Sequence, residues 1–191
     1  MKFPGKINTA VFISGRGSNL KSLIKYSKTK KSLIKIDLVV SNNSNAKGLE
    51  YAKKFKINNI FIKYSNRSAF ENRSLKLLKK KKIDLICLAG FMKILSSSFI
   101  KKFYKPILNI HPSLLPKYKG LNTHNRVIKN KEKFSGATVH IVDRRLDSGK
   151  IILQKKVKII KSESGQSLEK KVLKIEHEIY PKAIIRLLTS Y

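Results

Sequence analysis

Asn109 and His111 are candidate catalytic residues because their side chains can bind a reacting carbonyl and they stand two positions apart. They stand in the sequence Asn-Ile-His-Pro at 109–112. Residues two apart in an extended segment face the same side, so we expect both side chains to converge while Ile110 points into the core. An amide N–H₂ and an imidazole can both donate hydrogen bonds to the oxyanion that forms when a nucleophile adds to a carbonyl. A structural histidine at a strand end is the alternative.

Asp147 is the carboxylate that could complete this site. A carboxylate beside His111 would stabilise the imidazolium and raise its pKa, which suits a histidine that donates a proton. Asp147 lies two residues before Gly149, and an Asp in that position is also common turn chemistry. The sequence by itself does not bring Asp147 and His111 together.

The segment GRGSN at 15–19 is a candidate anion site. It lies where a strand is predicted to lead into a helix, and the free N–H groups of a helix start favour an anion. It lacks the third glycine of a dinucleotide fingerprint and the Gly-Lys-Ser/Thr of a P-loop, which argues against NAD and ATP. A single phosphate monoester fits better, and a tight turn without a ligand is the alternative.

Alternating strands and helices are predicted to position these residues. Apolar runs bounded by turns indicate strands, and apolar residues at helical spacing indicate helices. The near-continuous apolar run at 83–89 is typical of a strand buried on both faces of a parallel sheet. The pattern predicts an α/β domain with three layers and right-handed crossovers. The strands are expected at 9–14, 36–41, 59–63, 83–89, 107–110, 137–142 and 150–157, and helices after 19, after Ser44 as N-cap, and at 70–80, 96–103 and 164–188.

Two features of the C-terminal half refine this expectation. The strands at 137–142 and 150–157 are separated only by the turn around Asp147, so we expect them to be antiparallel neighbours. The loop at 112–125 is rich in Pro, Gly, Tyr and Asn, and a loop of this length is typical of a functional segment.

Composition limits the classes of protein. A chain of 191 residues predicts one domain spanning 1–191. The net charge of +32 fits nucleic-acid binding, but only seven of the 43 basic residues are Arg, the residue that base readout favours. We interpret the charge as compositional drift that leaves a solvated lysine surface. The lack of a long apolar run or a signal sequence predicts a cytoplasmic protein without a membrane span. Cys87, the only cysteine, is expected to be a buried small side chain.

Longer motifs resemble a known family. The chain is similar to the glycinamide ribonucleotide (phosphoribosylglycinamide) formyltransferases, folate-dependent enzymes of purine synthesis. The matching stretches are SGRGSNL at 14–20, the SN…A.GLE segment at 41–50, LAGFMKIL at 88–95, NIHPSLLPKYKGL at 109–121, Thr123-His124, LDSGKIILQ at 146–154 and EHEIYP at 176–181. They imply a Rossmann-like three-layer α/β/α formyltransferase fold with a mostly parallel sheet and an antiparallel C-terminal strand pair.

The resemblance also implies a reaction and a role for individual residues. A formyl group would pass directly from 10-formyltetrahydrofolate to the amine of 5-phosphoribosylglycinamide, through a tetrahedral intermediate and without a metal. Asn109, His111 and Asp147 would be catalytic, and His140 matches a family histidine near the site. The implied substrate-binding residues are Gly17, Ser18, Asn19 and Glu176, and the implied folate-binding residues are Arg67, Met92, Lys93, Ile94, Leu95 and Asn109.

For some of these binding residues, the residue type alone also fits a role outside the site. Met92, Ile94 and Leu95 would otherwise be ordinary core residues, and Glu176 an exposed glutamate on a helix. The chain departs from many relatives at 135–137 and at Arg144-Arg145, where two cations could lower the His111 pKa or bind folate carboxylates.

Three other functions fit part of the sequence. Methionyl-tRNA formyltransferase and formyltetrahydrofolate deformylase carry an additional domain, for which 191 residues leave no room. A basic nucleic-acid-binding protein without catalysis is the third. The expected partners are therefore the two small-molecule substrates, with no nucleic acid required, in a monomer or homodimer.

Overall fold

The computed structural model describes residues 5–190, which contain seven strands and six helices. The chain divides into two compact units, of which the first ends at Leu108 and the second covers 109–190. The boundary lies inside strand β5 (Ile107–His111), after its first two residues. The expectation of one domain over 1–191 remains a prediction.

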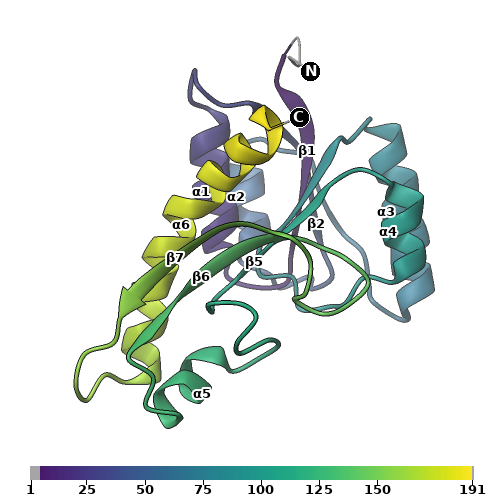
Figure 1. The fold of residues 1–191 in the computed structure, drawn as a ribbon. Helices are drawn as coiled ribbons and strands as arrows, with labels where there is room; N and C mark the ends of the chain where they lie inside the picture. The colour runs from purple at the N-terminus through teal and green to yellow at the C-terminus, as the bar shows by residue number, and fades with distance from the viewer. Residues whose placement is uncertain (1–4, 191) are drawn as a thin grey trace. The chain divides into compact units, whose positions relative to one another are not determined.

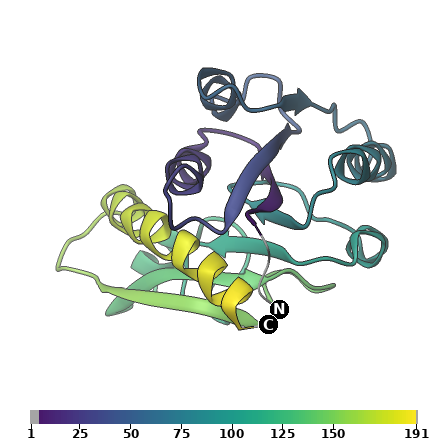
Figure 2. The same cartoon turned by 90° about the horizontal axis from the view of Figure 1, so that it is seen from above.

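The first unit is a parallel sheet with helices on both faces. Its strands lie in the order β3-β2-β1-β4-β5, and β2 pairs in parallel with β1 and β3, as β1 does with β4. Helices α1 and α2 cover one face, and α3 and α4 cover the other (Figures 1 and 2). This is the predicted three-layer arrangement. The elements are β1 (Ile7–Ile13), α1 (Ser18–Ser27), β2 (Ile34–Ser41), α2 (Gly48–Lys54), β3 (Asn59–Phe61), α3 (Arg67–Lys80), β4 (Leu85–Leu88) and α4 (Ser97–Phe103).

An aromatic cluster around Phe12 fixes the central strand against α3 and α4. Phe12 is fully buried in β1. Its ring meets Phe70 of α3 at 6.2 Å, Phe91 of the loop after β4 at 5.5 Å and Phe99 of α4 at 6.4 Å, all edge to face. Such pairs stabilise a core beyond the area that they bury. The glycine turn after β1 and the loop after β4 therefore begin at tightly packed residues.

Helix starts differ from the predictions where the cap lies elsewhere. Asn66 accepts a hydrogen bond from the Ala69 N–H at 2.8 Å, so α3 begins three residues before the predicted start. Ser44 as N-cap of α2 was wrong, because α2 begins at Gly48. The Gly48 N–H donates instead to the Gly15 carbonyl at 3.1 Å, so the glycine turn satisfies this helix start.

The second unit contains an antiparallel pair of strands that packs against one long helix. It contains the rest of β5, α5 (Thr123–Lys129), β6 (Phe134–Ile141), β7 (Ile151–Lys158) and α6 (Gly165–Thr189), with the strand order β5-β6-β7. β6 and β7 are antiparallel, as predicted, and α6 packs against both. Helix α5 was not predicted and takes up the end of the expected loop at 112–125. The predicted apolar stripe of α6 is confirmed, since its members are all buried: Leu168, Val172, Ile175, Ile179 and Ile184.

The fold class is thus the predicted one, a mostly parallel sheet with an antiparallel C-terminal pair. Cys87 is buried, as expected. Within residues 5–190, none of the helices is both long and apolar enough to pass through a membrane.

Candidate active site

Asp147 contacts both residues of the Asn-Ile-His segment. His111 Nδ1 lies 3.4 Å from Asp147 Oδ2, and Asn109 Nδ2 donates to Asp147 Oδ1 at 3.4 Å. His111 and Asp147 are buried, with 5% and 8% of their surface exposed. The intervening Ile110 is buried too, as the strand alternation of β5 requires. All three predicted catalytic residues therefore meet in the second unit.

His140 of β6 is the fourth member of this cluster. Its Nδ1 lies 3.0 Å from the Ile141 carbonyl oxygen, which can only accept, so Nδ1 carries the proton. The Nε2 atom of the neutral ring is then an acceptor for Asn109 Nδ2 at 3.2 Å. Both amide hydrogens of Asn109 are thereby engaged, one by His140 and one by Asp147. Asn109 must break one of these two hydrogen bonds before its N–H₂ can stabilise an oxyanion.

The loop after β5 closes over these residues through its backbone. His111 Nε2 donates to the Tyr118 carbonyl oxygen at 2.8 Å, and the Gly120 N–H donates to Asp147 Oδ2 at 2.9 Å. Gly120 has a φ of 77°, a conformation that favours glycine. The His111 N–H that we expect to contact a substrate is thus hydrogen-bonded to the Tyr118 carbonyl oxygen instead. A substrate oxygen reaches His111 Nε2 only when that carbonyl moves away.

Glu132 holds the other side of the same loop. Its Oε1 atom accepts from Tyr118 Oη at 2.9 Å and from Lys117 Nζ at 3.0 Å. Asn130 Nδ2 donates to Tyr118 Oη at 3.0 Å, and Arg126 Nη1 donates to the Lys119 carbonyl at 2.7 Å. The sequence indicated a functional loop but not these contacts, because they join residues far apart in the sequence and spacing does not reveal such pairs.

Burial controls the charge of His111. It lowers the His111 pKa below its usual 6.5, and it outweighs both the Tyr118 carbonyl and the negative charge of Asp147, which raise the pKa. The expectation that Asp147 would keep His111 charged was therefore wrong. Positive charge at His140 and at Arg126 lowers this pKa further. Arg144 and Arg145, which were considered for that role, are exposed.

Asp147 remains ionised in the same environment. Burial alone would raise its pKa, but the contact with His140, the hydrogen bond from the Gly120 N–H and the positive charge that either histidine carries when protonated bring the pKa below its usual 3.8. The cluster therefore combines a stable carboxylate with an imidazole that is neutral near pH 7. Such an imidazole is ready to accept a proton that the carboxylate then stabilises.

The glycine turn of the first unit has the geometry of a helix-start anion site. Gly17 is the N-cap of α1 with a φ of 73°, and no side chain caps this helix. A Cβ atom on Gly17 would lie 2.4 Å from the Gly48 Cα, so only glycine fits. Ser18 and Asn19 form the first turn, which contains no acidic residue. The start of α1 therefore favours a negatively charged group.

The predicted folate residues form an exposed apolar loop, also in the first unit. Met92 and Ile94 are 62% and 53% exposed, whereas Leu95 is buried. The interpretation of Met92 and Ile94 as core residues was thus wrong. The Met92 N–H donates to Ser14 Oγ at 2.8 Å, and the Ser14 N–H donates to the Gly90 carbonyl at 3.1 Å. Ser14 therefore anchors this loop beside the glycine turn.

The other predicted binding residues are Lys93, Arg67 and Glu176. Lys93 Nζ lies 4.7 Å from the centre of the Tyr64 ring, and Arg67 is the exposed first residue of α3. Glu176 of α6 is only 7% exposed, so its interpretation as a surface glutamate was wrong. A buried carboxylate is costly unless it has a specific task or partner.

Comparison with known proteins identifies the family. The model of the family described as formyl transferase matches residues 7–184. The chain belongs to the formyl transferase family. The phosphoribosylglycinamide formyltransferase of Escherichia coli is 39% identical over 181 residues, which are 93% of this chain and 85% of that protein. The crystal structure of the Brucella melitensis enzyme of the same name superposes with a TM-score of 0.91 at 37% identity and covers 96% of both chains.

Larger members of the formyl transferase family also match. The trifunctional purine biosynthetic protein adenosine-3 of Bos taurus is 41% identical over 184 residues, which are 95% of this chain but only 18% of that protein. The chain thus spans less than a fifth of the length of this relative.

Proposed function

We propose that this chain is a phosphoribosylglycinamide formyltransferase that transfers the formyl group of 10-formyltetrahydrofolate to the amino group of 5-phosphoribosylglycinamide, a step of de novo purine biosynthesis. The observation that carries the proposal is the buried contact of Asp147 with Asn109 and His111 at 3.4 Å each. The relatives that the chain covers almost completely bear this enzyme's name.

The proposed reaction is a direct transfer through a tetrahedral intermediate. The lone pair of the substrate amine attacks the formyl carbon, and the formyl oxygen becomes an oxyanion. Asn109 and His111 exchange their protein acceptors for this oxygen and stabilise its charge with their N–H groups. The intermediate collapses when the bond from carbon to the folate nitrogen N10 breaks.

The reaction also requires one proton to move from the amine to N10. The attacking amine loses one proton and the departing N10 gains one, so no net proton is consumed. His111, neutral near pH 7, accepts the amine proton beside Asp147 and returns it toward N10, directly or through water. Holding the two substrates in line supplies a further large part of the rate enhancement.

The binding residues follow the same proposal. Gly17, Ser18 and Asn19 hold the substrate phosphate at the start of α1, and Glu176 contacts the ribose or glycinamide part. Support for the phosphate site is the glycine-specific turn, which is independent of the family match. The folate lies on the exposed loop 92–95, with Arg67 and Asn109 as further contacts.

The setting of the enzyme is part of the proposal. We propose a cytoplasmic monomer or homodimer that acts on small molecules and requires no nucleic acid. Lysines far outnumber arginines among its basic residues, which supports a solvated surface rather than base readout.

A formyl-transfer assay with both substrates tests the proposal. We expect activity in the parent and a loss of at least about a hundredfold in His111→Ala, given the usual size of acid–base and oxyanion contributions. His124→Ala, which removes another partly buried histidine of the second unit, is the control. An active parent with an unaffected His111→Ala variant would contradict the mechanism, and formate release without an amine acceptor would indicate a deformylase.

A further inference from the structure

The exposed loop 92–95 is held at each end by a side chain from another part of the first unit. At its start, the Met92 N–H donates to Ser14 Oγ at 2.8 Å. Just past its end, Ser96 bonds to Glu71 of α3. Among residues 5–190, the backbone N–H and C=O groups of 93–95 have no hydrogen-bond partner. The conformation of the loop therefore depends strongly on these two end contacts.

The Ser14 hydroxyl is oriented toward the loop by Asn42. Ser14 directly follows β1, and Asn42 directly follows β2, the neighbouring strand. Ser14 Oγ donates its single hydrogen to Asn42 Oδ1 at 2.5 Å. Its lone pairs are then left to accept, and the Met92 N–H is the donor that they meet. Two hydrogen bonds in series thus connect the carboxyl ends of β2 and β1 with the loop after β4.

The backbone of Ser14 is held separately from its hydroxyl. The Ser14 N–H donates to the Gly90 carbonyl at 3.1 Å, and the Ser14 carbonyl accepts from Asn43 Nδ2 at 3.1 Å. Because these contacts do not involve the hydroxyl, they keep Ser14 and the glycine turn that follows it in place when the hydroxyl is removed. The hydroxyl therefore serves the loop rather than the proposed phosphate site.

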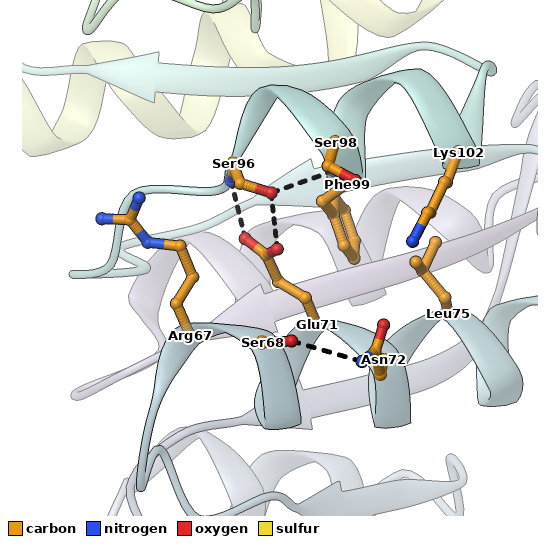
Figure 3. Close-up of a pocket in the computed structure, with 9 residues that line it drawn as sticks. All are labelled: Arg67, Ser68, Glu71, Asn72, Leu75, Ser96, Ser98, Phe99 and Lys102. Carbon is orange, nitrogen blue, oxygen red and sulfur yellow. Dashed lines mark hydrogen bonds between the residues drawn. The ribbon is translucent and has the colours of Figure 1, made fainter.

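Glu71 holds the other end of the loop. Its two carboxylate oxygens accept from the Ser96 N–H and from Ser96 Oγ at 2.6 Å each, as Figure 3 shows. Glu71 is only 6% exposed, and hydrogen bonds to a carboxylate are stronger than those between neutral groups. Ser96 Oγ also accepts from the Phe99 N–H at 3.0 Å as the N-cap of α4. The end of the loop is thus tied to α3 and α4 together.

We propose that Ser14 and Glu71 are positioning residues that hold the loop 92–95 ready for the folate. They set the affinity for 10-formyltetrahydrofolate and do not touch the reacting atoms. This inference rests on the proposed function. A binding surface that is ordered in advance loses less conformational entropy when its ligand arrives. Fixed ends also keep the exposed Met92 and Ile94 side chains from collapsing onto nearby apolar surface, where they would be hidden from the ligand.

A division of kinetic effects between the two substrates tests the role of Ser14. For Ser14→Ala we expect the KM for 10-formyltetrahydrofolate to rise about threefold to tenfold, the usual effect of one lost hydrogen bond. We expect kcat and the KM for 5-phosphoribosylglycinamide to stay within about twofold of the parent, because the backbone contacts of Ser14 remain. A merely structural loss would change all three values.

Asn43→Ala is the matched control for Ser14→Ala. It removes the side-chain bond to the Ser14 carbonyl and leaves the hydroxyl bridge to Met92 in place. We expect all three kinetic values to stay within about twofold of the parent. An unchanged folate KM in Ser14→Ala, or an equal rise in Asn43→Ala, would overturn the proposal.

Glu71→Gln tests the other end of the loop. The amide keeps one oxygen for Ser96 but loses the charge and the second acceptor, so we expect the folate KM to rise about twofold to fivefold. Asn72→Ala is the control, since Asn72 is the next residue of α3 and bonds to Ser68 Oγ instead. Equal folate KM values in the two variants would overturn the role of Glu71.

Hydrogen exchange and folate binding distinguish a failure of this inference from a failure of the proposed function. NMR of the protein without substrates should show the Met92 amide exchanging at least about fivefold faster in Ser14→Ala than in the parent or in Asn43→Ala. If the parent transfers no formyl group, the proposed function fails, and titration with tetrahydrofolate still compares the variants. Weaker binding by Ser14→Ala alone supports the positioning role. Equal or undetectable binding in all three proteins, or an unchanged Met92 exchange rate, refutes it.

Discussion

His111 Nδ1 lies 3.4 Å from Asp147 Oδ2 in a buried setting, yet burial still lowers the His111 pKa. In the neutral ring the hydrogen sits on Nε2, which donates to the Tyr118 carbonyl. The lone pair of Nδ1 then faces a carboxylate, and this is an unfavourable contact that a proton on Nδ1 would relieve. The pair therefore provides a place for a proton released during the reaction.

Asp147→Asn tests this relationship. The substitution keeps the size of the side chain but removes the charge that stabilises a protonated His111. We expect kcat to fall by about 10²–10⁴, the usual range for a lost acid–base contribution, while KM changes by less than about threefold. Steady-state kinetics with both substrates measure this. Asp143→Asn, in the same turn but bonded to the Arg145 N–H, is the control. A kcat within about tenfold of the parent would contradict the role of the charge.

The sequence predicted the first unit well because its central strands, β1 and β4, are almost completely buried. The continuous apolar run at 83–89 contains β4 (Leu85–Leu88), all of whose residues are buried. Helix starts were predicted less well where the backbone supplies the cap. The start of α2 bonds to the Gly15 carbonyl, a contact with no side-chain signature, and so Ser44 was chosen wrongly.

The candidate site was predictable to the extent that it depends on local alternation. Asn109 and His111 are two apart on one strand, and their convergence follows from strand geometry. The contact with Asp147 is long-range, and the family resemblance rather than spacing indicated it. Asn109 donates a hydrogen bond to His140, and His111 donates one to the Tyr118 carbonyl. Both contacts depend on tertiary structure, and the sequence did not predict them.

Gly17→Ala should damage the proposed phosphate site and the first unit together. A Cβ at this position would lie 2.4 Å from the Gly48 Cα, and the φ of 73° is unfavourable for alanine. We expect a loss of about 1–3 kcal/mol in the free energy of unfolding, measured by chemical denaturation, and weaker binding of 5-phosphoribosylglycinamide. Gly15→Ala is the control, since its Cβ would meet nothing within 4 Å. Equal stability of the two variants would refute the argument.

Stability should decrease between pH 7.5 and pH 5.5 because of buried histidines. Burial lowers the pKa of His111 and of His124 below 6.5, so the unfolded chain binds protons that the folded chain does not. Their contribution to stability is complete above pH 6.5 and is lost as the pH falls toward the folded pKa values. Denaturant midpoints at the two pH values measure this loss. The lowered pKa values of carboxylates such as Glu178, at about 2, act only in more acidic solution.

The variant His111→Asn/His124→Asn separates this effect from other titrations. Without the two buried imidazoles, we expect the midpoint to change much less between pH 7.5 and pH 5.5. The comparison is made within each variant, so a general loss of stability in the double variant does not obscure it. An equally steep dependence in parent and variant would show that other groups are responsible.

Glu132→Gln should loosen the loop that covers the catalytic cluster. Glu132 holds Tyr118 and Lys117, and the Tyr118 carbonyl accepts from His111 Nε2. Without the carboxylate we expect trypsin to cleave after Lys117 several-fold faster, because loops with fewer anchoring contacts open more often. Limited proteolysis followed by mass spectrometry measures the rate.

The matched control for this variant is Glu178→Gln. Glu178 also binds two groups, Lys155 and Lys182, but it lies on α6 and outside the catalytic cluster. We expect its cleavage rate after Lys117 to equal that of the parent. We further expect kcat to change in Glu132→Gln alone, because only there does the partner of His111 lose its anchor. Equal cleavage and equal kcat in both variants would show that Glu132 does not control the loop.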